Sequence, residues 1–409
     1  MNASPRFTPY QKKLLGFLSV ATFFEGYDFF ALTQVLPHLR TEFALDHAEA
    51  SQLLGVVNMG AVLAYALVSK ADRYGRKAVL NITILGYTLL SAASGLAPNV
   101  IVFGLCQLLA RIFLIGEWAT SMVIAAEEFP KERRGFALGM VGAMAGLGSV
   151  LCVAVVPALT KAFGWRSVYF VGVFPLLLVA YARRGLRETS RFETKSESKE
   201  GESNIKGLLK SAYRGRAIRL GLIWFLTYLA TQNAVSVWKD YAMTELNLSE
   251  TAAGGTMTIA ALVALPVAFL TGPLIDLVGR RIGATLILTL TSLGVYGSYS
   301  LAPGALLTIA LTFAVIGVSA VLTALNAFTT ELFPTEVRGS AFAFSNNILG
   351  RTGYWVSPFV VGAIANQTGW GLPLRVAALF PLIAVVLVWL WLPETRGVEL
   401  EEVEKPTEG

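Results

Sequence analysis

Charged side chains are scarce in this 409-residue chain. Asp, Glu, Lys and Arg make up 15% of it, against about 25% in soluble domains, while 55% of residues are hydrophobic. Too few polar side chains are present to cover a soluble globule. Cysteine is nearly absent as well: Cys106 and Cys152 lie in apolar stretches, far from any cysteine or histidine partner, which leaves neither a disulfide framework nor a metal-binding spacing.

Histidine is equally rare. His38 and His47 are the two in the chain, and both are expected in an outer loop. They do not provide the nucleophile and base, or the metal cluster, that a membrane enzyme needs. We therefore expect no enzymatic activity and no cofactor.

Long apolar stretches fill most of the chain. A helix that crosses about 30 Å of hydrocarbon needs roughly 20 mostly apolar residues, and twelve such stretches begin near residues 14, 50, 78, 100, 136, 166, 218, 252, 282, 304, 340 and 372. The start, Met1 to Lys13, is polar and lacks a small-residue cleavage site, so no cleavable signal peptide is indicated. The pattern predicts an all-α membrane protein with twelve transmembrane helices.

Basic residues gather on one side of the predicted helices. Of the 33 Lys and Arg, 26 fall on the side that holds both termini, five fall on the opposite side, and Arg111 and Arg351 lie inside apolar stretches. Cytoplasmic loops of membrane proteins collect Lys and Arg. We therefore predict that both termini are cytoplasmic, and the net charge of +6 does not indicate nucleic-acid binding.

The two halves of the chain repeat each other. The segment 129–135 (FPKERRG) recurs at 333–339 (FPTEVRG), and the same offset of 204 residues carries Asp72 onto Asp276. Residues 191–216 are rich in Glu, Lys and Ser, as in a solvated linker. We predict two six-helix halves at 1–190 and 217–397, this linker between them, and a cytoplasmic tail at 398–409. Such duplication implies a solute site near the membrane midplane.

Several motifs resemble those of the major facilitator superfamily. Residues 71–77 (ADRYGRK) are similar to that family's signature loop between helices two and three, and residues 272–281 to its second copy. Val68, Lys70 and Leu277 depart from the usual signature, which puts the strength of a cytoplasmic latch at the first loop in question. The resemblance implies transport of a small solute by alternating access.

Three further motifs indicate a particular branch of this family: Gly26-Tyr27-Asp28, Gly116-Glu117 and the segment 350–353 (GRTG). They are similar to motifs of the aromatic-acid:proton and metabolite:proton symporters and the related organic-ion carriers. That resemblance implies a multi-pass protein of the inner (plasma) membrane that takes up a mono- or aromatic carboxylate together with protons. We expect it to act as a monomer, with no nucleic-acid partner.

Other functions on the same fold stay open. The segment 393–397 (PETRG) is equally similar to sugar porters, so a sugar or organic-cation carrier is one alternative and a proton-driven efflux antiporter is another. A non-transporting sensor would carry a folded cytoplasmic output domain. The predicted linker and tail are short and polar, which disfavours a sensor.

Charges without a counterpart in the other half are the candidates for coupling. Glu25, Asp28, Arg111, Glu117 and Arg351 all lie inside apolar stretches, where a charge is costly. The first two are three residues apart on one helix face, and neighbouring carboxylates away from water cannot both stay ionised cheaply. We predict that Asp28 is the proton-coupling residue, with Glu25 next. The alternative is a permanent ion pair with Arg111.

Arg351 is the expected anion receptor, because a guanidinium stays charged and matches a carboxylate. Asn347 and Tyr354 would share its helix face, and Tyr228, Gln232, Tyr27 and Asn58 would line a partly aromatic pocket. The alternative is that Arg351 serves as an internal partner of the two carboxylates. The predicted substrate-binding set is Arg351, Arg111, Tyr27, Asn58, Tyr228, Gln232, Asn347 and Tyr354.

Repeated charges at cytoplasmic helix ends are expected to form gates, because carboxylate and guanidinium pairs there can lock one conformation. Glu117 joins them because it lies toward the cytoplasm. The alternative is a cluster that only sets topology. The predicted gating set is Asp72, Arg73, Arg76, Glu117, Arg134, Asp276, Arg280 and Arg338.

Overall fold

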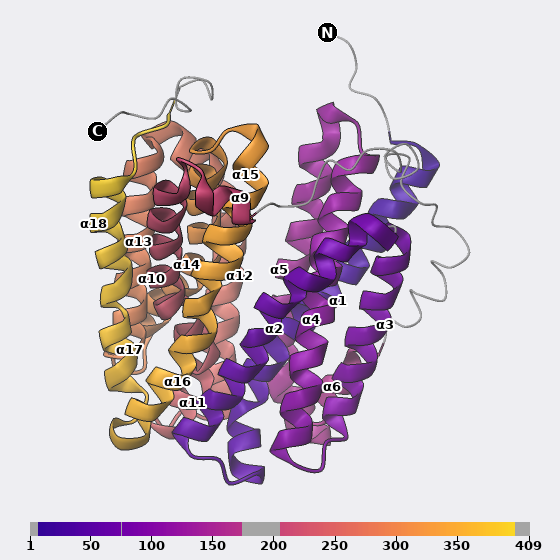
Figure 1. Ribbon diagram of the computed structural model, residues 1–409. Helices are drawn as coiled ribbons and strands as arrows, with labels where there is room; N and C mark the ends of the chain where they lie inside the picture. The colour runs from indigo at the N-terminus through magenta and orange to yellow at the C-terminus, as the bar shows by residue number, and fades with distance from the viewer. Residues whose placement is uncertain (1–6, 75, 174–204, 397–409) are drawn as a thin grey trace. The chain divides into compact units, whose positions relative to one another are not determined.

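The computed structural model describes residues 7–74, 76–173 and 205–396, without the side chains of 65–76, 131–132 and 335–336. Within these residues the only regular structure is helical (Figure 1). Each of the twelve predicted starting points falls inside a helix or directly before one. The expected all-α architecture is confirmed.

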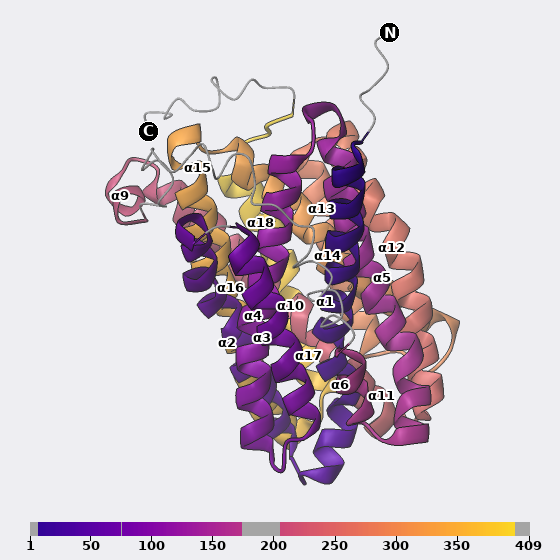
Figure 2. The same ribbon diagram turned by 90° about the vertical axis from the view of Figure 1, so that its right-hand side faces the viewer.

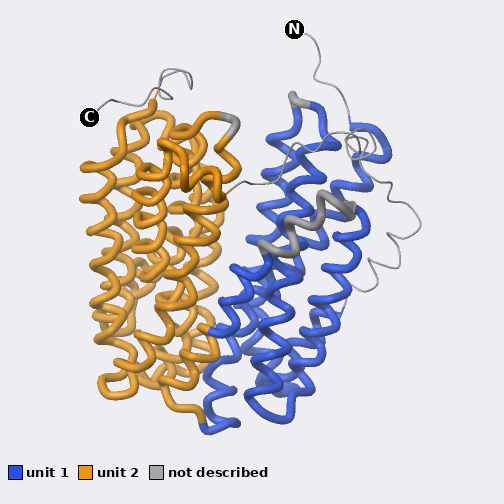
Figure 3. Tube along the Cα trace, in the orientation of Figure 1, with its two compact units in different colours: residues 1–44, 56–200 blue, residues 45–55, 201–409 orange. Residues whose placement is uncertain are grey.

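The chain divides into two compact units (Figure 3). Unit 1 holds residues 1–44 and 56–200, and unit 2 holds residues 45–55 and 201–409. The predicted linker begins within residues 174–204, which lie outside the described part of the chain, so the predicted boundaries at 190 and 216 stay predictions.

Unit 1 is built around the helix pair α1 and α5. Its described helices are α1 (Pro9–Glu42), α2 (His47–Tyr74, of which the first turns belong to unit 2), α3 (Arg76–Gly95), α4 (Val100–Glu128), α5 (Lys131–Phe163) and α6 (Ser167–Val171). Helices α1 and α5 run side by side (Figure 2), and α3 packs against α4.

Glycines allow the close approach of α1 and α5. A Cβ on Gly148 would lie 1.7 Å from the carbonyl oxygen of Phe23, and one on Gly26 would lie 1.9 Å from that of Ala145. Small residues let helix backbones meet in this way in membranes. This contact fixes the position of Asp28, two residues beyond Gly26 on α1.

Unit 2 contains α9 (Ile205–Lys210), α10 (Arg214–Ser236), α11 (Trp238–Thr244), α12 (Glu250–Val278), α13 (Arg280–Ser298), α14 (Ala305–Glu331), α15 (Thr335–Phe342), η1 (Ala343–Gly350), α16 (Arg351–Thr368), α17 (Gly371–Ala377) and α18 (Leu379–Trp391). Helix α10 packs against η1 and α16, and α13 packs against α14 and α18. Helices α10 and α11 meet at a bend of 47°.

One span of unit 2 departs from a regular α-helix. The stretch predicted to begin near residue 340 consists of α15, the π-helical segment η1 and α16. A π-helical turn holds an extra residue, and such turns are frequent at functional sites. Every side chain after η1 is therefore rotated relative to a regular helix, which decides what lies beside Arg351.

The helices suit a lipid environment. Among the described residues, seven helices are long and apolar enough to cross a membrane, or eight if the bent pair α10 and α11 counts as one span. Large apolar side chains such as Leu270 and Leu390 are exposed. An apolar surface this extensive is not expected of a soluble monomer.

Candidate functional site

The unrepeated charges of unit 1 meet in the interior of that unit. Glu25 and Asp28 on α1 and Arg111 and Glu117 on α4 have exposed fractions of only 7%, 7%, 6% and 0%. Glu25 interacts electrostatically with the other three. The Arg111 guanidinium also covers the ring of Phe29, with 4.2 Å between its Cζ and the ring centroid. The fold thus brings all four predicted charges into one cluster.

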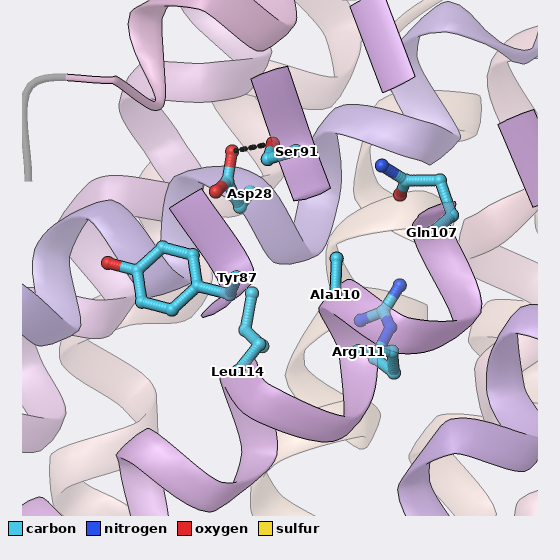
Figure 4. A pocket seen from close by; sticks show the side chains of 7 residues that line it. All are labelled: Asp28, Tyr87, Ser91, Gln107, Ala110, Arg111 and Leu114. Carbon is cyan, nitrogen blue, oxygen red and sulfur yellow. Dashed lines mark hydrogen bonds between the residues drawn. The ribbon is translucent and has the colours of Figure 1, made fainter. Parts of the chain in front are cut away.

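Asp28 lies at the wall of a small cavity (Figure 4). Its Oδ1 accepts a hydrogen bond from the Ser91 hydroxyl at 3.2 Å. The cavity measures about 10 Å³, close to the room that one water molecule needs. Its lining residues are Asp28, Tyr87, Ser91, Gln107, Ala110, Arg111 and Leu114.

The cluster has unused hydrogen-bonding capacity. Four buried polar atoms of the cluster have no hydrogen-bond partner among the described residues: Glu25 Oε2, Asp28 Oδ2, Glu117 Oε2 and Arg111 Nη1. Buried polar atoms are normally satisfied by protein or by ordered water. The three carboxylate oxygens can therefore take up water or protons, and Arg111 Nη1 can donate to a water, without losing an existing hydrogen bond.

The charges of the cluster do not balance. The described residues supply three buried carboxylates and one guanidinium, which would leave two uncompensated negative charges if every group were ionised. An unpaired charge in such a setting costs several kcal/mol. Binding of two protons makes the cluster neutral.

Glu117 lies in this cluster rather than among exposed cytoplasmic charges. Its side chain is fully buried, and its Oε1 accepts a hydrogen bond from the Ser121 hydroxyl at 2.6 Å. Glu25 is its neighbour in this cluster. The gating role of Glu117 stays a prediction.

Aromatic rings and amides surround Arg351 in unit 2. The Tyr228 hydroxyl donates a hydrogen bond to Asn346 Oδ1 at 3.0 Å, and the Arg351 side chain hydrogen-bonds to Tyr228. The Tyr228 ring stacks on Trp224, with centroids 5.4 Å apart, and meets Tyr354 edge-on at 5.9 Å. The predicted Arg351, Tyr228 and Tyr354 thus form one group.

The amide in this group is not the one that helical spacing indicates. A regular helix would place Asn347 one turn before Arg351, but the π-helical segment makes Asn346 the partner of Tyr228. Asn346 is buried, whereas Asn347 and Gln232 are half-buried. Asn346 was missed because the sequence shows no sign of the extra residue.

Two further predicted residues lie in unit 1. The Tyr27 hydroxyl donates a hydrogen bond to the Val168 carbonyl oxygen at 3.2 Å, which ties α1 to α6. Asn58 is buried on α2, two residues before Gly60. A Cβ on Gly60 would lie 2.9 Å from that of Arg111, so this stretch of α2 packs directly beside the charged cluster. No finding tests substrate binding by either residue.

The predicted gate of unit 2 contains a network of ion pairs. Arg280 pairs with Asp276 one turn before it, and its Nη2 lies 2.8 Å from Glu331 Oε1. The hydroxyl of Thr395 donates a hydrogen bond to the same Glu331. Sequence reasoning identified Asp276 and Arg280 but missed Glu331, whose position beside them depends on the fold.

Glu394 closes this network from the segment after α18. Its carboxylate accepts hydrogen bonds from the backbone N–H groups of Arg280 at 2.8 Å and Arg281 at 2.9 Å, at the start of α13. Burial alone would raise the pKa of Glu394, but these N–H groups, with those of Arg396 and Thr395, lower the pKa below its ordinary value. An ionised Glu394 therefore stabilises the N-terminus of α13.

The remaining predicted gating residues form no ion-pair network among the described side chains. The side chains of Asp72, Arg73 and Arg76 lie outside the described part of the structure. Arg134 is half-buried, and Arg338 Nε donates a hydrogen bond to the Phe333 carbonyl oxygen at 3.1 Å. Their gating roles stay predictions.

The fold and the buried charges define a class of protein. A chain of long apolar helices in two compact units, with ionisable groups buried inside them, is a multi-pass membrane transporter. The sequence profile of the Major Facilitator Superfamily matches residues 18–238 and 220–408. The chain therefore belongs to the major facilitator superfamily, with its twelve-helix fold, and is a transporter rather than an enzyme.

Relatives cover nearly the whole chain. A probable 4-methylmuconolactone transporter of Cupriavidus pinatubonensis is 29% identical over 408 residues, which cover 97% of this chain and 94% of the relative. A cis,cis-muconate transport protein of Acinetobacter baylyi is 26% identical and covers 93% of this chain and 94% of its own. A crystal structure of a D-xylose-proton symporter superposes with a TM-score of 0.79 at 19% identity, covering 95% of this chain and 99% of that one, and this likeness shows the fold.

Proposed function

We propose that the protein is a proton-coupled symporter that takes up a small organic carboxylate across the inner membrane. The observation that carries the coupling is the charge imbalance in unit 1, where three buried carboxylates surround one guanidinium. Such a cluster binds protons readily because each proton removes a buried charge. The two relatives named above are named for muconolactone and muconate, which are organic acids.

Asp28 is the coupling residue in this proposal. One of its oxygens is held by Ser91, the other has no protein partner, and the cavity beside it admits about one water molecule. A water there gives the carboxylate a route for exchanging its proton. When Asp28 is protonated its attraction to Arg111 disappears, which changes the forces between α1 and α4. That change links the proton to a conformational step.

Arg351 binds the carboxylate of the substrate in this proposal. Its guanidinium is always charged and can hold a carboxylate through two hydrogen bonds. Tyr228 orients the guanidinium, and Tyr354 offers an aromatic face to a planar organic group. A ring or conjugated chain attached to the carboxylate therefore suits the group better than a flexible polar solute.

Uptake into proteoliposomes tests this function. Radiolabelled 4-hydroxybenzoate, cis,cis-muconate, a hexose and an organic cation would be offered with and without an inward proton gradient, to the wild type and to Asp28→Asn. The expected result is gradient-driven accumulation of a carboxylate that is lost in the variant. Transport of the sugar or the cation alone would support one of the alternative carriers. Expulsion of preloaded carboxylate driven by an inward proton gradient would support efflux.

Glu128→Gln serves as a matched control in the same assay. Glu128 is the last residue of α4 and lies outside the buried cluster. This variant should accumulate the carboxylate like the wild type. A loss equal to that of Asp28→Asn would show that removal of any carboxylate from unit 1 impairs transport, and the coupling assignment would fail.

A further inference from the structure

The proposed function uses one carboxylate of the buried cluster and leaves Glu117 unexplained. This side chain is fully buried inside a transmembrane helix, and only its Oε1 is hydrogen-bonded, to Ser121. Its Oε2 has no hydrogen-bond partner among the described residues. A carboxylate that served packing alone would be expected to have both oxygens satisfied.

Tyr87 on α3 is the second unexplained group. Its ring packs in the core of unit 1 and lines the cavity at Asp28, and its buried hydroxyl has no described hydrogen-bond partner other than the side chain of the adjacent Thr88. The hydroxyl points away from Gln107 and Arg111 (Figure 4) and interacts electrostatically with Glu117, then with Asp28 and Glu25. All three carboxylates therefore act electrostatically on the Tyr87 hydroxyl.

The described residues around the cluster offer no second cation. In the sequence, residues 56–68 of α2, 79–95 of α3 and 135–157 of α5 contain no Asp, Glu, Lys, Arg or His. The titratable and charged groups that the described helices direct at the cluster are Glu25, Tyr27 and Asp28 of α1, Tyr87 of α3, Arg111 and Glu117 of α4, Cys152 of α5 and Tyr169 of α6. Arg111 can neutralise one carboxylate at a time, so two others must be neutralised by protons.

We propose that Glu117 is a second proton-binding site, connected to Asp28 through the Tyr87 hydroxyl and the water-sized cavity, and that two protons move with each substrate. The inference rests on the proposed function, because it adds a proton to the same transport cycle.

The transfer through Tyr87 is balanced. The phenol gives its proton to one carboxylate as it accepts a proton from the other side, so Tyr87 is unchanged after each passage. Glu25 lies beside both end points and interacts with each of them. Ser121 holds one oxygen of Glu117 in place and leaves the other to exchange the proton.

The test is the number of protons that enter with each substrate. Internal pH would be followed with a trapped dye while uptake of labelled 4-hydroxybenzoate or cis,cis-muconate is counted in the same proteoliposomes. The wild type should give a ratio of two. Glu117→Gln should give one and should still accumulate substrate, because Asp28 remains. Glu128→Gln should keep the wild-type ratio.

Tyr87→Phe tests the proton path through Tyr87 separately from the proton-binding site at Glu117. This variant keeps both carboxylates, so the ratio of two should stay, while the proton-driven rate should fall about tenfold. An unchanged rate would remove Tyr87 from the path.

The measured proton-to-substrate ratio distinguishes failure of this inference from failure of the proposed function. A wild-type ratio of one overturns the inference, even if no Glu117 variant folds, and leaves the proposed function standing. A ratio of two that persists in Glu117→Gln also overturns it. Substrate uptake without any proton entry in the wild type would reject the proposed function itself.

Discussion

The Tyr228 hydroxyl donates a hydrogen bond to Asn346 Oδ1 at 3.0 Å, across the contact between α10 and the π-helical segment η1. With its proton engaged by Asn346, the Tyr228 oxygen is free to accept from the Arg351 guanidinium. One buried amide therefore sets the direction of two hydrogen bonds. Asn346 therefore acts on Arg351 through Tyr228.

Asn346→Ala should weaken carboxylate transport. Loss of a buried hydrogen bond costs about 0.5 to 1.5 kcal/mol, so we expect KM for the transported carboxylate to rise about two- to thirteenfold. Asn366→Ala, which removes an exposed amide on α16, is the matched control and should stay within about twofold of the wild type. In a Tyr228→Phe background Asn346→Ala should have little further effect, because the two residues act through one bond. Additive losses would mean that Asn346 acts elsewhere.

Arg351→Lys tests recognition of the carboxylate. Lysine keeps the positive charge but cannot present two parallel N–H donors. We expect the Kd for the carboxylate to rise at least about tenfold, which corresponds to about 1.4 kcal/mol. Arg375→Lys is the control, since Arg375 lies on α17 and donates to the Gly371 carbonyl oxygen. Equilibrium binding to purified protein measures both, and an undiminished affinity of Arg351→Lys contradicts the anion-binding role.

Gly148→Ala should destabilise unit 1. The added Cβ would lie 1.7 Å from the Phe23 carbonyl oxygen, so α1 and α5 must separate. Overpacking of this kind typically costs about 1 to 3 kcal/mol. Gly139→Ala on the same helix meets nothing within 4 Å and should be neutral or slightly stabilising. Thermal unfolding in detergent compares the two, and equal stability of both variants would show that the helices do not meet at Gly148.

Glu394→Gln should destabilise the N-terminus of α13, and the size of this effect should depend on pH. Because the pKa of Glu394 is lowered in the folded protein, its ionised form stabilises the fold above the ordinary glutamate pKa of about 4.3, and this contribution is lost as pH falls through the lowered value. We expect a difference in free energy of unfolding of about 0.5 to 1 kcal/mol at pH 7, because the group is partly exposed to screening solvent.

The wild type and Glu394→Gln should therefore converge as the pH is taken below about 4. Denaturant unfolding at a series of pH values measures the difference. A gap that persists unchanged as the pH is taken well below about 4 would show that the carboxylate acts through its shape rather than its charge.

The fold and the charged part of the site could be predicted from the sequence, because both leave strong signals. Apolar stretches of spanning length mark the helices, and a charge such as Asp28 or Arg111 stands out within them because it is expensive there. The repeat at an offset of 204 residues indicated the two halves, and the resemblance to the superfamily is confirmed.

The neutral members of the site could not be found in the same way. Ser91 and Tyr87 are ordinary residues of membrane helices, so nothing in the sequence separates them from similar residues used for packing. The contact between Glu394 and Arg280 joins positions 114 residues apart. It follows from how α18 ends beside α13, and local patterns do not encode that.

The extra residue in η1 also affects how this transporter can be compared with its relatives. Successive residues of a helix are rotated by about 100° about its axis. A relative that lacks the extra residue would therefore direct a different side chain at its counterpart of Tyr228, even if all of its other residues were the same. One inserted or deleted residue in segment 343–350 would therefore be enough to change which side chain meets Tyr228, with the residues on either side unchanged.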